Sequence, residues 1–289
     1  MLDSILANET SVRLMAFGLM LIVIAVWELA APRRRVEIPR VVRWSNNLGL
    51  VVLDSIVVRL VFPFLAVGLA IIAEDRSWGL MNSVNIPGWL AVLIAVLVLD
   101  FAIYLQHVLF HAVPAFWRLH RVHHADLEFD LTTGLRFHPI EIVLSMIWKM
   151  AIVAALGAPP IAVLVFEVVL NATSIFNHSN IALPRSVDAI LRLFVVTPDM
   201  HRVHHSVYVR ETNSNFGFNL PWWDRLFGTY KAQPRDGHQD MTIGIEQFRS
   251  VGELRLDRML MQPFVDDTGN YPIGRGTKTT SADKDDSSL

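Results

Sequence analysis

The sequence contains no cysteine among its 289 residues. This absence excludes disulfide bonds, thiolate zinc sites, iron–sulfur clusters and a cysteine nucleophile. Charged residues are also scarce, at 18% of the chain, and the formal net charge is −2, so no basic surface indicates a nucleic-acid partner. Any metal bound by this chain must therefore be held by histidine, carboxylate, amide or water ligands.

Hydrophobic residues, by contrast, make up 53% of the chain, and the mean hydropathy of +0.40 is high for a soluble domain. A transmembrane helix needs about 20 apolar residues. Stretches of sufficient length lie at residues 12–31, 48–73, 89–111 and 142–176. The last exceeds one span and is interrupted by Gly-Ala-Pro-Pro at 157–160, which predicts a helical hairpin or a re-entrant pair. We therefore expect an all-α integral membrane bundle of about four transmembrane helices or hairpins.

Positive charge predicts the orientation of this bundle. Five arginines follow the first apolar stretch, at positions 33, 34, 35, 40 and 43. This pattern favours a retained first helix over a cleaved signal peptide, and it predicts that the loop is cytoplasmic. When the later spans are counted from that loop, all the histidine-rich segments fall on the same side of the membrane.

Histidines provide the main functional signal. The chain has 11, and ten of them lie between residues 107 and 205. Three tight groups hold eight of these: His107 and His111; His120, His123 and His124; His201, His204 and His205. On a helix, residues four apart share one face, whereas adjacent residues diverge by about 100°. One group can therefore supply two neighbouring metals, and His138 and His178 would complete two sets of four or five nitrogen ligands.

The spacing alone does not choose the metal, because imidazole suits iron, zinc, copper and nickel. Left without a metal, so many neutral histidines would leave buried ring nitrogens unpaired. The Glu-x-x-His pairs of carboxylate di-iron bundles and the His-Glu-x-x-His of zincins are both absent. One alternative is a non-enzymatic metal-binding or transport protein, whose ligands should lie near mid-membrane. Another is a bis-histidine haem anchor, which needs far fewer histidines.

Four polar side chains are candidates to orient the metal ligands. Asp100 lies on the same predicted helical stripe as His107 and His111, and Glu167 and Asn171 lie on a stripe with His178; Glu141 follows the His138-Pro139 pair. A carboxylate near a ligand can accept its distal N–H and fix the ring. Internal helix–helix hydrogen bonds are the alternative role for these residues. We expect Asp224 and Arg225 to pair structurally, and no catalytic residue separate from the metal centre.

Composition divides the chain into four parts. Residues 1–94 are expected to form N-terminal transmembrane helices, and 95–237 a catalytic domain with a histidine-rich cap. Residues 238–265 are expected to form an amphipathic segment, with one helix within 241–261. The chain from residue 266 to 289 is rich in threonine, serine, aspartate and lysine, which predicts a disordered tail.

The histidine groups and their flanking text resemble the fatty acid hydroxylase and sterol desaturase superfamily of membrane di-iron enzymes, and in particular its bacterial members. The motifs are HVLFH at 107–111, HRVHH at 120–124 and 201–205, RFHPIE at 136–141, NHSN at 177–180 and NFGFNLPWWDRLFGTY at 215–230. The resemblance covers roughly residues 95 to 231. It carries the ligand role to the eight motif histidines, to His178, and less directly to His138.

The resemblance implies an oxidoreductase with a cytosol-facing site in a bacterial inner membrane. Two iron ions would be the cofactor, with zinc possible in a purified or resting form, and oxygen would be the co-substrate. The substrate class would be a lipid, such as a fatty acyl chain or sterol, hydroxylated or desaturated at a C–H bond. Electrons would come from a separate ferredoxin- or cytochrome-type donor, because the chain has no cysteine cluster and no dinucleotide fingerprint. Aromatic residues expected along the lipid path are Trp117, Trp148, Phe176, Trp222 and Trp223. The lipid and the oligomeric state are not indicated.

Overall fold

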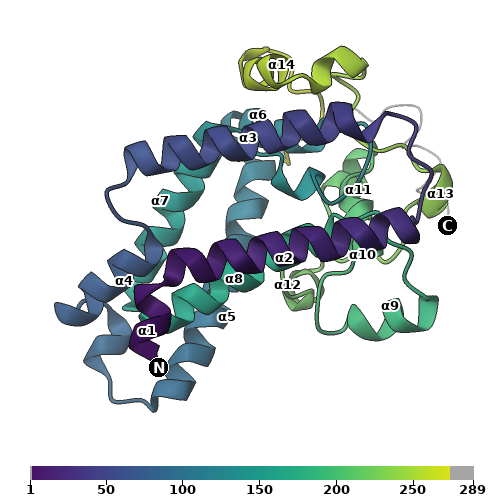
Figure 1. Ribbon diagram of the computed structural model, residues 1–289. Coiled ribbons are helices and arrows are strands. Elements are labelled where there is room, and N and C mark those ends of the chain that lie inside the picture. Colours follow the sequence, from purple (N-terminus) through teal and green to yellow (C-terminus); the bar gives the residue numbers. More distant parts are fainter. Residues whose placement is uncertain (1, 274–289) are drawn as a thin grey trace.

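The computed structural model describes residues 2–273, which form helices and no strand (Figure 1). The five longest helices carry the apolar stretches: α2 (Glu9–Ala30), α3 (Arg40–Val61), α5 (Gly88–Ala112), α7 (Pro139–Leu156) and α8 (Pro160–Asn177). Shorter α-helices complete the structure: α1 (Leu2–Ala7), α4 (Ala66–Asp75), α6 (Pro114–His124), α9 (Arg185–Leu191), α10 (Pro198–His204), α11 (Val209–Thr212), α12 (Trp222–Phe227), α13 (Gly237–Asp240) and α14 (Leu256–Met261). The 3-10 turns are η1 (Leu80–Ser83), η2 (Thr133–Leu135), η3 (Val251–Leu254) and η4 (Gln262–Phe264).

Five segments of the described chain are long and apolar enough to cross a membrane. They are α2, the continuous region Arg40–Ser83 that contains α3 and α4, and the helices α5, α7 and α8. Large apolar side chains on their outer faces, such as Leu14, Leu19 and Leu60, are exposed as lipid contact requires. The predicted all-α membrane bundle is confirmed, and the chain is a multi-pass membrane protein.

The apolar stretch 48–73 is divided between two helices. Helix α3 ends at Val61 and α4 begins at Ala66. Pro63 lies between them; it has no N–H to donate, and its ring disfavours a helical conformation for Phe62, which is extended with φ −112° and ψ 119°. The chain therefore bends before it reaches the end of the bundle.

The predicted break at residues 157–160 is present and produces two separate helices. Gly157 ends α7 with a left-handed φ of +64°. A Cβ at this position would lie 2.4 Å from the carbonyl oxygen of Trp78, so glycine is required there for both conformation and space. The two arms diverge: α7 packs against α3 and α5, and α8 against α2 and α5.

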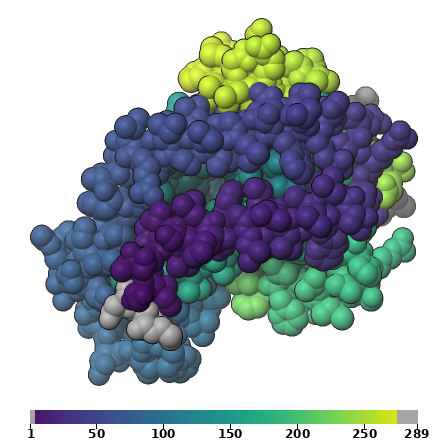
Figure 2. Space-filling model, in the orientation of Figure 1, coloured from purple at the N-terminus to yellow at the C-terminus, as the bar shows by residue number. Residues whose placement is uncertain are grey.

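Helices α2 and α3 form the outer pair of the bundle in Figure 1 and leave a hollow between them, through which the interior is visible in Figure 2. Their connecting loop lies beside the short helices of the second half of the chain. Arg33 of this loop pairs with Asp199 of α10 at 3.2 Å. Arg34 donates to the carbonyl oxygens of His238 and Met241, each at 2.8 Å. The arginine-rich loop and the histidine-bearing helices therefore lie at the same end of the bundle.

The C-terminal segment departs from the sequence expectation. Residues 266–273 were expected to begin a disordered tail, but Tyr271 is fully buried and stacks on Trp117 with ring centroids 5.3 Å apart. The carbonyl oxygen of Tyr271 also accepts from Asn213 at 2.8 Å. Aromatic burial overrides the polar composition of this stretch. The rest of the predicted tail, 274–289, lies outside the described residues. Between 241 and 261 the only α-helix is the short α14.

Candidate metal centre

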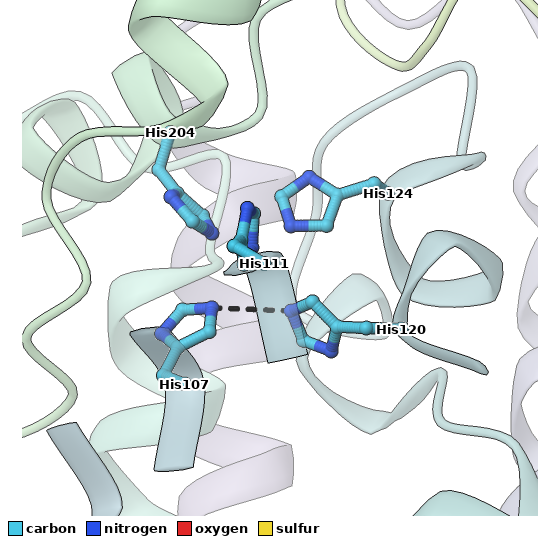
Figure 3. Close-up of side chains that lie close together, drawn as sticks. All are labelled: His107, His111, His120, His124 and His204. Carbon is cyan, nitrogen blue, oxygen red and sulfur yellow. Dashed lines mark hydrogen bonds between the residues drawn. The ribbon is translucent and has the colours of Figure 1, made fainter. Parts of the chain in front are cut away.

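Nine buried histidines converge at one end of the bundle, in two clusters. We call them the five-histidine cluster and the four-histidine cluster. The first consists of His107, His111, His120, His124 and His204, and the second of His123, His178, His201 and His205. Within each cluster, one nitrogen from every ring lies within 4.8 Å of all the others. Figure 3 shows the five rings of the first cluster pointing toward a common centre.

Helical geometry explains how one sequence motif serves both clusters. His123 and His124 are neighbours on α6, and His204 and His205 are neighbours at the end of α10, yet the members of each pair enter different clusters. Adjacent residues on a helix diverge by about 100°, so their side chains reach opposite sides. His107 and His111 are four positions apart on α5, which brings both to the same cluster.

The outer nitrogens of these rings are held by acceptors. The Nδ1–H of His107 donates to the Phe216 carbonyl oxygen at 2.8 Å, and that of His204 to the Ser214 carbonyl oxygen at 2.7 Å. His111 donates to Asn213 Oδ1 at 3.0 Å. Because a carbonyl oxygen can only accept, each Nδ1 must carry the hydrogen. Each Nε2 is therefore left with a lone pair directed into the cluster.

No group within residues 2–273 donates to most of the inner nitrogens. Nε2 of His111, His124 and His204 are all buried without a hydrogen-bond partner in this part of the chain. Nε2 of His107 and His120 face each other at 3.1 Å, the contact dashed in Figure 3. Nδ1 of His107 donates to Phe216 and Nδ1 of His120 to Glu141 Oε1 at 2.6 Å, so this contact brings two Nε2 lone pairs together. Such an arrangement is unfavourable unless a cation lies between the rings, so the residues fit a metal ion.

The four-histidine cluster shows the same convergence. His178 follows the last residue of α8 and donates from Nδ1 to the Ser174 carbonyl oxygen at 2.8 Å. Its Nε2 faces Nε2 of His123 at 3.1 Å and Nε2 of His201 at 3.0 Å. Burial lowers the pKa of His178 to about 3, which keeps the ring neutral and able to bind a metal. His205 adds two further buried ring nitrogens, neither of which has a hydrogen-bond partner in the described chain.

His138 lies in neither cluster, although the sequence placed it among the ligand candidates. It precedes α7, where its Nδ1 accepts from the backbone N–H of Ile140 at 3.2 Å, and its Nε2 lies 3.3 Å from the Leu260 carbonyl oxygen. Its role is to cap the helix. His238, which was not a candidate, is also outside both clusters and lies 3.7 Å from Asp199.

Of the four candidate orienting residues, only Glu141 contacts a histidine. Its Oε1 accepts from Nδ1 of His120 at 2.6 Å. Asp100 instead accepts from Trp223 Nε1 at 2.7 Å. Glu167 pairs with Arg13 and Lys149 in the membrane region, and Asn171 donates to the Glu167 carbonyl oxygen.

We expect Glu141→Gln to lower metal affinity by about 10- to 100-fold, the usual effect of losing a carboxylate that orients a metal-bound histidine. Metal content after dialysis against a graded series of chelator concentrations measures this affinity. Asp100→Asn is the matched control, since it removes a carboxylate that touches no histidine. Equal metal retention by the two variants would contradict the assigned role of Glu141.

Sequence reasoning missed the groups that hold the outer nitrogens. Two of these groups are the backbone carbonyls of Ser214 and Phe216. Ser214 directly precedes the NFGFN motif, and Phe216 is its second residue. Asp224 supports this segment by accepting from the N–H groups of Phe216 and Gly217, each at 2.8 Å. Asp224 therefore fixes the backbone segment whose carbonyl oxygens accept from His107 and His204. The expected pairing with Arg225 did not predict this role.

A large cavity leads from the membrane region to the five-histidine cluster. It has a volume of about 520 Å³ and reaches His107 and His120 at its inner end. It opens between α2 and α3, the hollow visible in Figure 2, where Leu14, Val51 and Ser55 line it. None of the five aromatic residues expected along the lipid path lines this cavity; Phe17, Phe110, Phe137 and Phe218 do.

Comparison with known proteins identifies the region that contains these features. Residues 92–229 match the sequence model of the fatty acid hydroxylase family. An ornithine lipid hydroxylase of Rhizobium tropici is 32% identical over 173 residues, which cover 60% of this chain and 50% of the relative. Human alkylglycerol monooxygenase is 29% identical over 54% of this chain and 34% of its own length. Rat cholesterol 25-hydroxylase is 32% identical over 56% and 53%.

The matches thus span about half the length of these relatives, or less. No solved structure matches the chain. All nine clustered histidines, Glu141 and the carbonyl groups that hold the rings fall within the matched residues. Residues 92–229 therefore form a fatty acid hydroxylase domain within this chain.

Proposed function

We propose that this protein is an oxygen-dependent membrane oxidoreductase that holds two iron ions and hydroxylates a C–H bond of a lipid. The observation that carries the proposal is the cavity that joins the lipid-facing gap between α2 and α3 to the five-histidine cluster. A long acyl chain or sterol can enter such an opening sideways from the membrane. Residues 95–237 would act as the catalytic unit, with the preceding helices forming part of the cavity wall.

Iron is proposed over zinc because the relatives are named as hydroxylases and monooxygenases, and zinc has no redox chemistry. Bound iron would supply the activation of oxygen. The nine clustered histidines would be the ligands, with Glu141 fixing the ring of His120. The apolar cavity wall would exclude water and place one carbon of the substrate beside His107 and His120.

Further parts of the proposal follow from chain composition and topology. Electrons would come from a separate ferredoxin- or cytochrome-type protein, since no cysteine cluster is present to carry them. The arginine-rich loop lies at the same end of the bundle as the clusters. A cytoplasmic loop would therefore place the site at the cytoplasmic face, in the inner membrane if the source is a bacterium.

Lipid analysis by mass spectrometry tests this function. Cells with and without the protein are compared under isotopically labelled oxygen, and we expect one lipid class to gain a labelled oxygen atom. Loss of two hydrogens would indicate desaturation instead. The absence of any lipid change, with a metal-loaded protein, would favour a non-enzymatic metal-binding protein.

The same comparison tests the route of the lipid. Ser55→Trp places a large ring at the opening between α2 and α3, and we expect product to fall at least about tenfold while metal content is unchanged. Ile56→Trp is the matched control, because Ile56 is exposed on the same helix and does not line the cavity. Normal product from Ser55→Trp would show that the lipid enters elsewhere.

A further inference from the structure

Two short helices of the histidine-bearing half of the chain carry apolar side chains on their outer sides. They are α9 and α12, and we call the large apolar side chains that they and the turn after α9 expose the α9–α12 surface. Its members are Ile190, Leu193 and Phe194 from α9 and that turn, and Trp222, Leu226 and Phe227 from α12. Leu226 is 70% exposed, and Ile190 and Phe194 are each 62% exposed. Figure 1 shows α9 at the periphery of the molecule, outside the bundle of long helices.

Both helices bury an acid while they expose these apolar side chains. Asp188 of α9 is buried and pairs with Arg192, whose guanidinium also donates to the Ala232 carbonyl oxygen at 3.1 Å. Asp224 of α12 is buried and accepts from the backbone N–H of Phe216 at 2.8 Å. A helix that faces water has the reverse arrangement, with apolar side chains inside and charged side chains outside. The inverted arrangement suits helices whose outer faces meet an apolar phase.

Hydrogen bonds hold α12 against the turn that ends α9. Trp222 Nε1 donates to the Leu193 carbonyl oxygen at 2.7 Å, and the Arg225 guanidinium donates to the Arg192 carbonyl oxygen at 3.1 Å. The exposed side chains of the two helices therefore form one patch instead of two separate ones. A contiguous exposed apolar patch marks a surface that meets a partner or a membrane.

The contacts between α12 and α5 give the depth of this patch. Trp223 Nε1 donates to Asp100 at 2.7 Å, and Phe227 stacks on Phe101 with ring centroids 5.8 Å apart. Asp100 and Phe101 are the thirteenth and fourteenth of the 25 residues of α5. About 20 residues of helix cross a bilayer, so the middle of α5 lies within it. Helix α12 therefore lies at the level of the bilayer, beside a helix that spans it.

The patch is also continuous with side chains that face lipid. Leu105 lies one turn beyond Phe101 on α5 and is exposed. Exposed arginines occur on both short helices, Arg185 at the start of α9 and Arg225 on α12. Arginine and tryptophan side chains are common where acyl chains meet headgroups, because each has an apolar body and a polar end. We propose that the α9–α12 surface is inserted into the leaflet beside the histidine clusters, with the lipids of that leaflet as its partner.

This docking goes beyond the proposed function, since it would hold whether or not the protein oxidises a lipid. It changes where the histidine-bearing half of the chain lies. This half would be partly sunk in the membrane, instead of resting on it as a water-covered cap.

Spin labelling tests this insertion, because the chain has no cysteine and one introduced cysteine carries the label at a single known position. Leu226→Cys and Phe194→Cys are labelled in the full-length protein, which is reconstituted in phosphatidylcholine vesicles. Electron paramagnetic resonance measures how often the label collides with oxygen, which concentrates in lipid, and with a neutral nickel chelate, which stays in water. We expect the ratio of oxygen to chelate collisions to be at least about tenfold higher at both positions than at a water-facing position, because polar solutes are excluded from the acyl region.

Two further variants calibrate the measurement. Leu19→Cys is the lipid-facing reference, since Leu19 is exposed in the middle of α2, and Asp240→Cys is the water-facing reference, since Asp240 is exposed on α13 beside the arginine-rich loop. Ratios at Leu226 and Phe194 that match the ratio at Asp240 would overturn the proposal. Labels shielded from both reagents would also overturn it, because protein, such as a second copy of this chain, would then cover the surface. Helical circular dichroism shows that each variant is folded, and either labelled position alone is sufficient for the test.

Discussion

Replacing His204 with alanine is expected to empty the five-histidine cluster and abolish lipid oxidation. Nε2 of His204 is buried, points into the cluster and has no hydrogen-bond partner among the residues that the structure describes. Loss of a residue that only orients a ligand typically costs about 10- to 100-fold, so loss of a ligand should exceed about a hundredfold in activity. Iron quantification on purified protein should fall from two metal ions per chain to one, alongside the activity measurement.

His138→Ala is the matched control, because the sequence proposed His138 as a ligand and the structure places it outside both clusters. We expect this variant to keep both metal ions and to lose only the cap of α7, worth about 1 kcal/mol. A His138→Ala protein that lost a metal ion would support the sequence-based prediction that His138 is a metal ligand. A His204→Ala protein with full metal content would refute the ligand assignment.

The second large effect concerns stability. Arg43 is fully buried on α3 and pairs with two fully buried acids, Asp126 at 2.7 Å and Asp130. These acids belong to the loop that follows the histidines of α6. Arg43→Ala would leave buried Asp130 without an ion-pair partner in the described chain and Asp126 with only Arg136, at 4.0 Å, so we expect it to lower the free energy of unfolding by about 3–5 kcal/mol or to prevent folding.

Arg40→Ala provides the comparison, since Arg40 lies one turn earlier on α3 and forms no ion pair with the described residues. Its effect should stay within about 0.5 kcal/mol. Unfolding in detergent, followed by helical circular dichroism against increasing denaturant, measures both variants. If the two arginine variants lost the same stability, the buried ion-pair network would not be what holds this loop.

Local sequence was sufficient to predict the apolar helices and the division of each histidine triplet between two neighbouring sites, because both depend on periodicity. It did not separate His178 from His138, each of which stands alone at a helix boundary. His178 follows α8 and turns toward His123, whereas His138 precedes Pro139 and caps α7. Only the packing of α7 and α8 against α5 determines which ring reaches a cluster.

The groups that hold the histidine rings in place were even harder to predict from the sequence. The carbonyl oxygens of Ser214 and Phe216 hold two rings, and a backbone group leaves no signature in a sequence. The burial of Tyr271 also contradicted a composition typical of a disordered segment. The bend at Pro63, by contrast, could have been predicted, because proline inside an apolar run normally ends a helix.

The way the clusters are assembled from distant parts of the chain has a consequence for how the protein is made in the cell. Each cluster combines histidines of α6 with histidines of α10. Neither can be complete until translation has passed residue 205, when the five apolar segments have already been synthesised. Asn213, which holds His111, gains its own support only when Tyr271 is added. If the clusters bind metal, loading would therefore follow the synthesis of all five apolar segments.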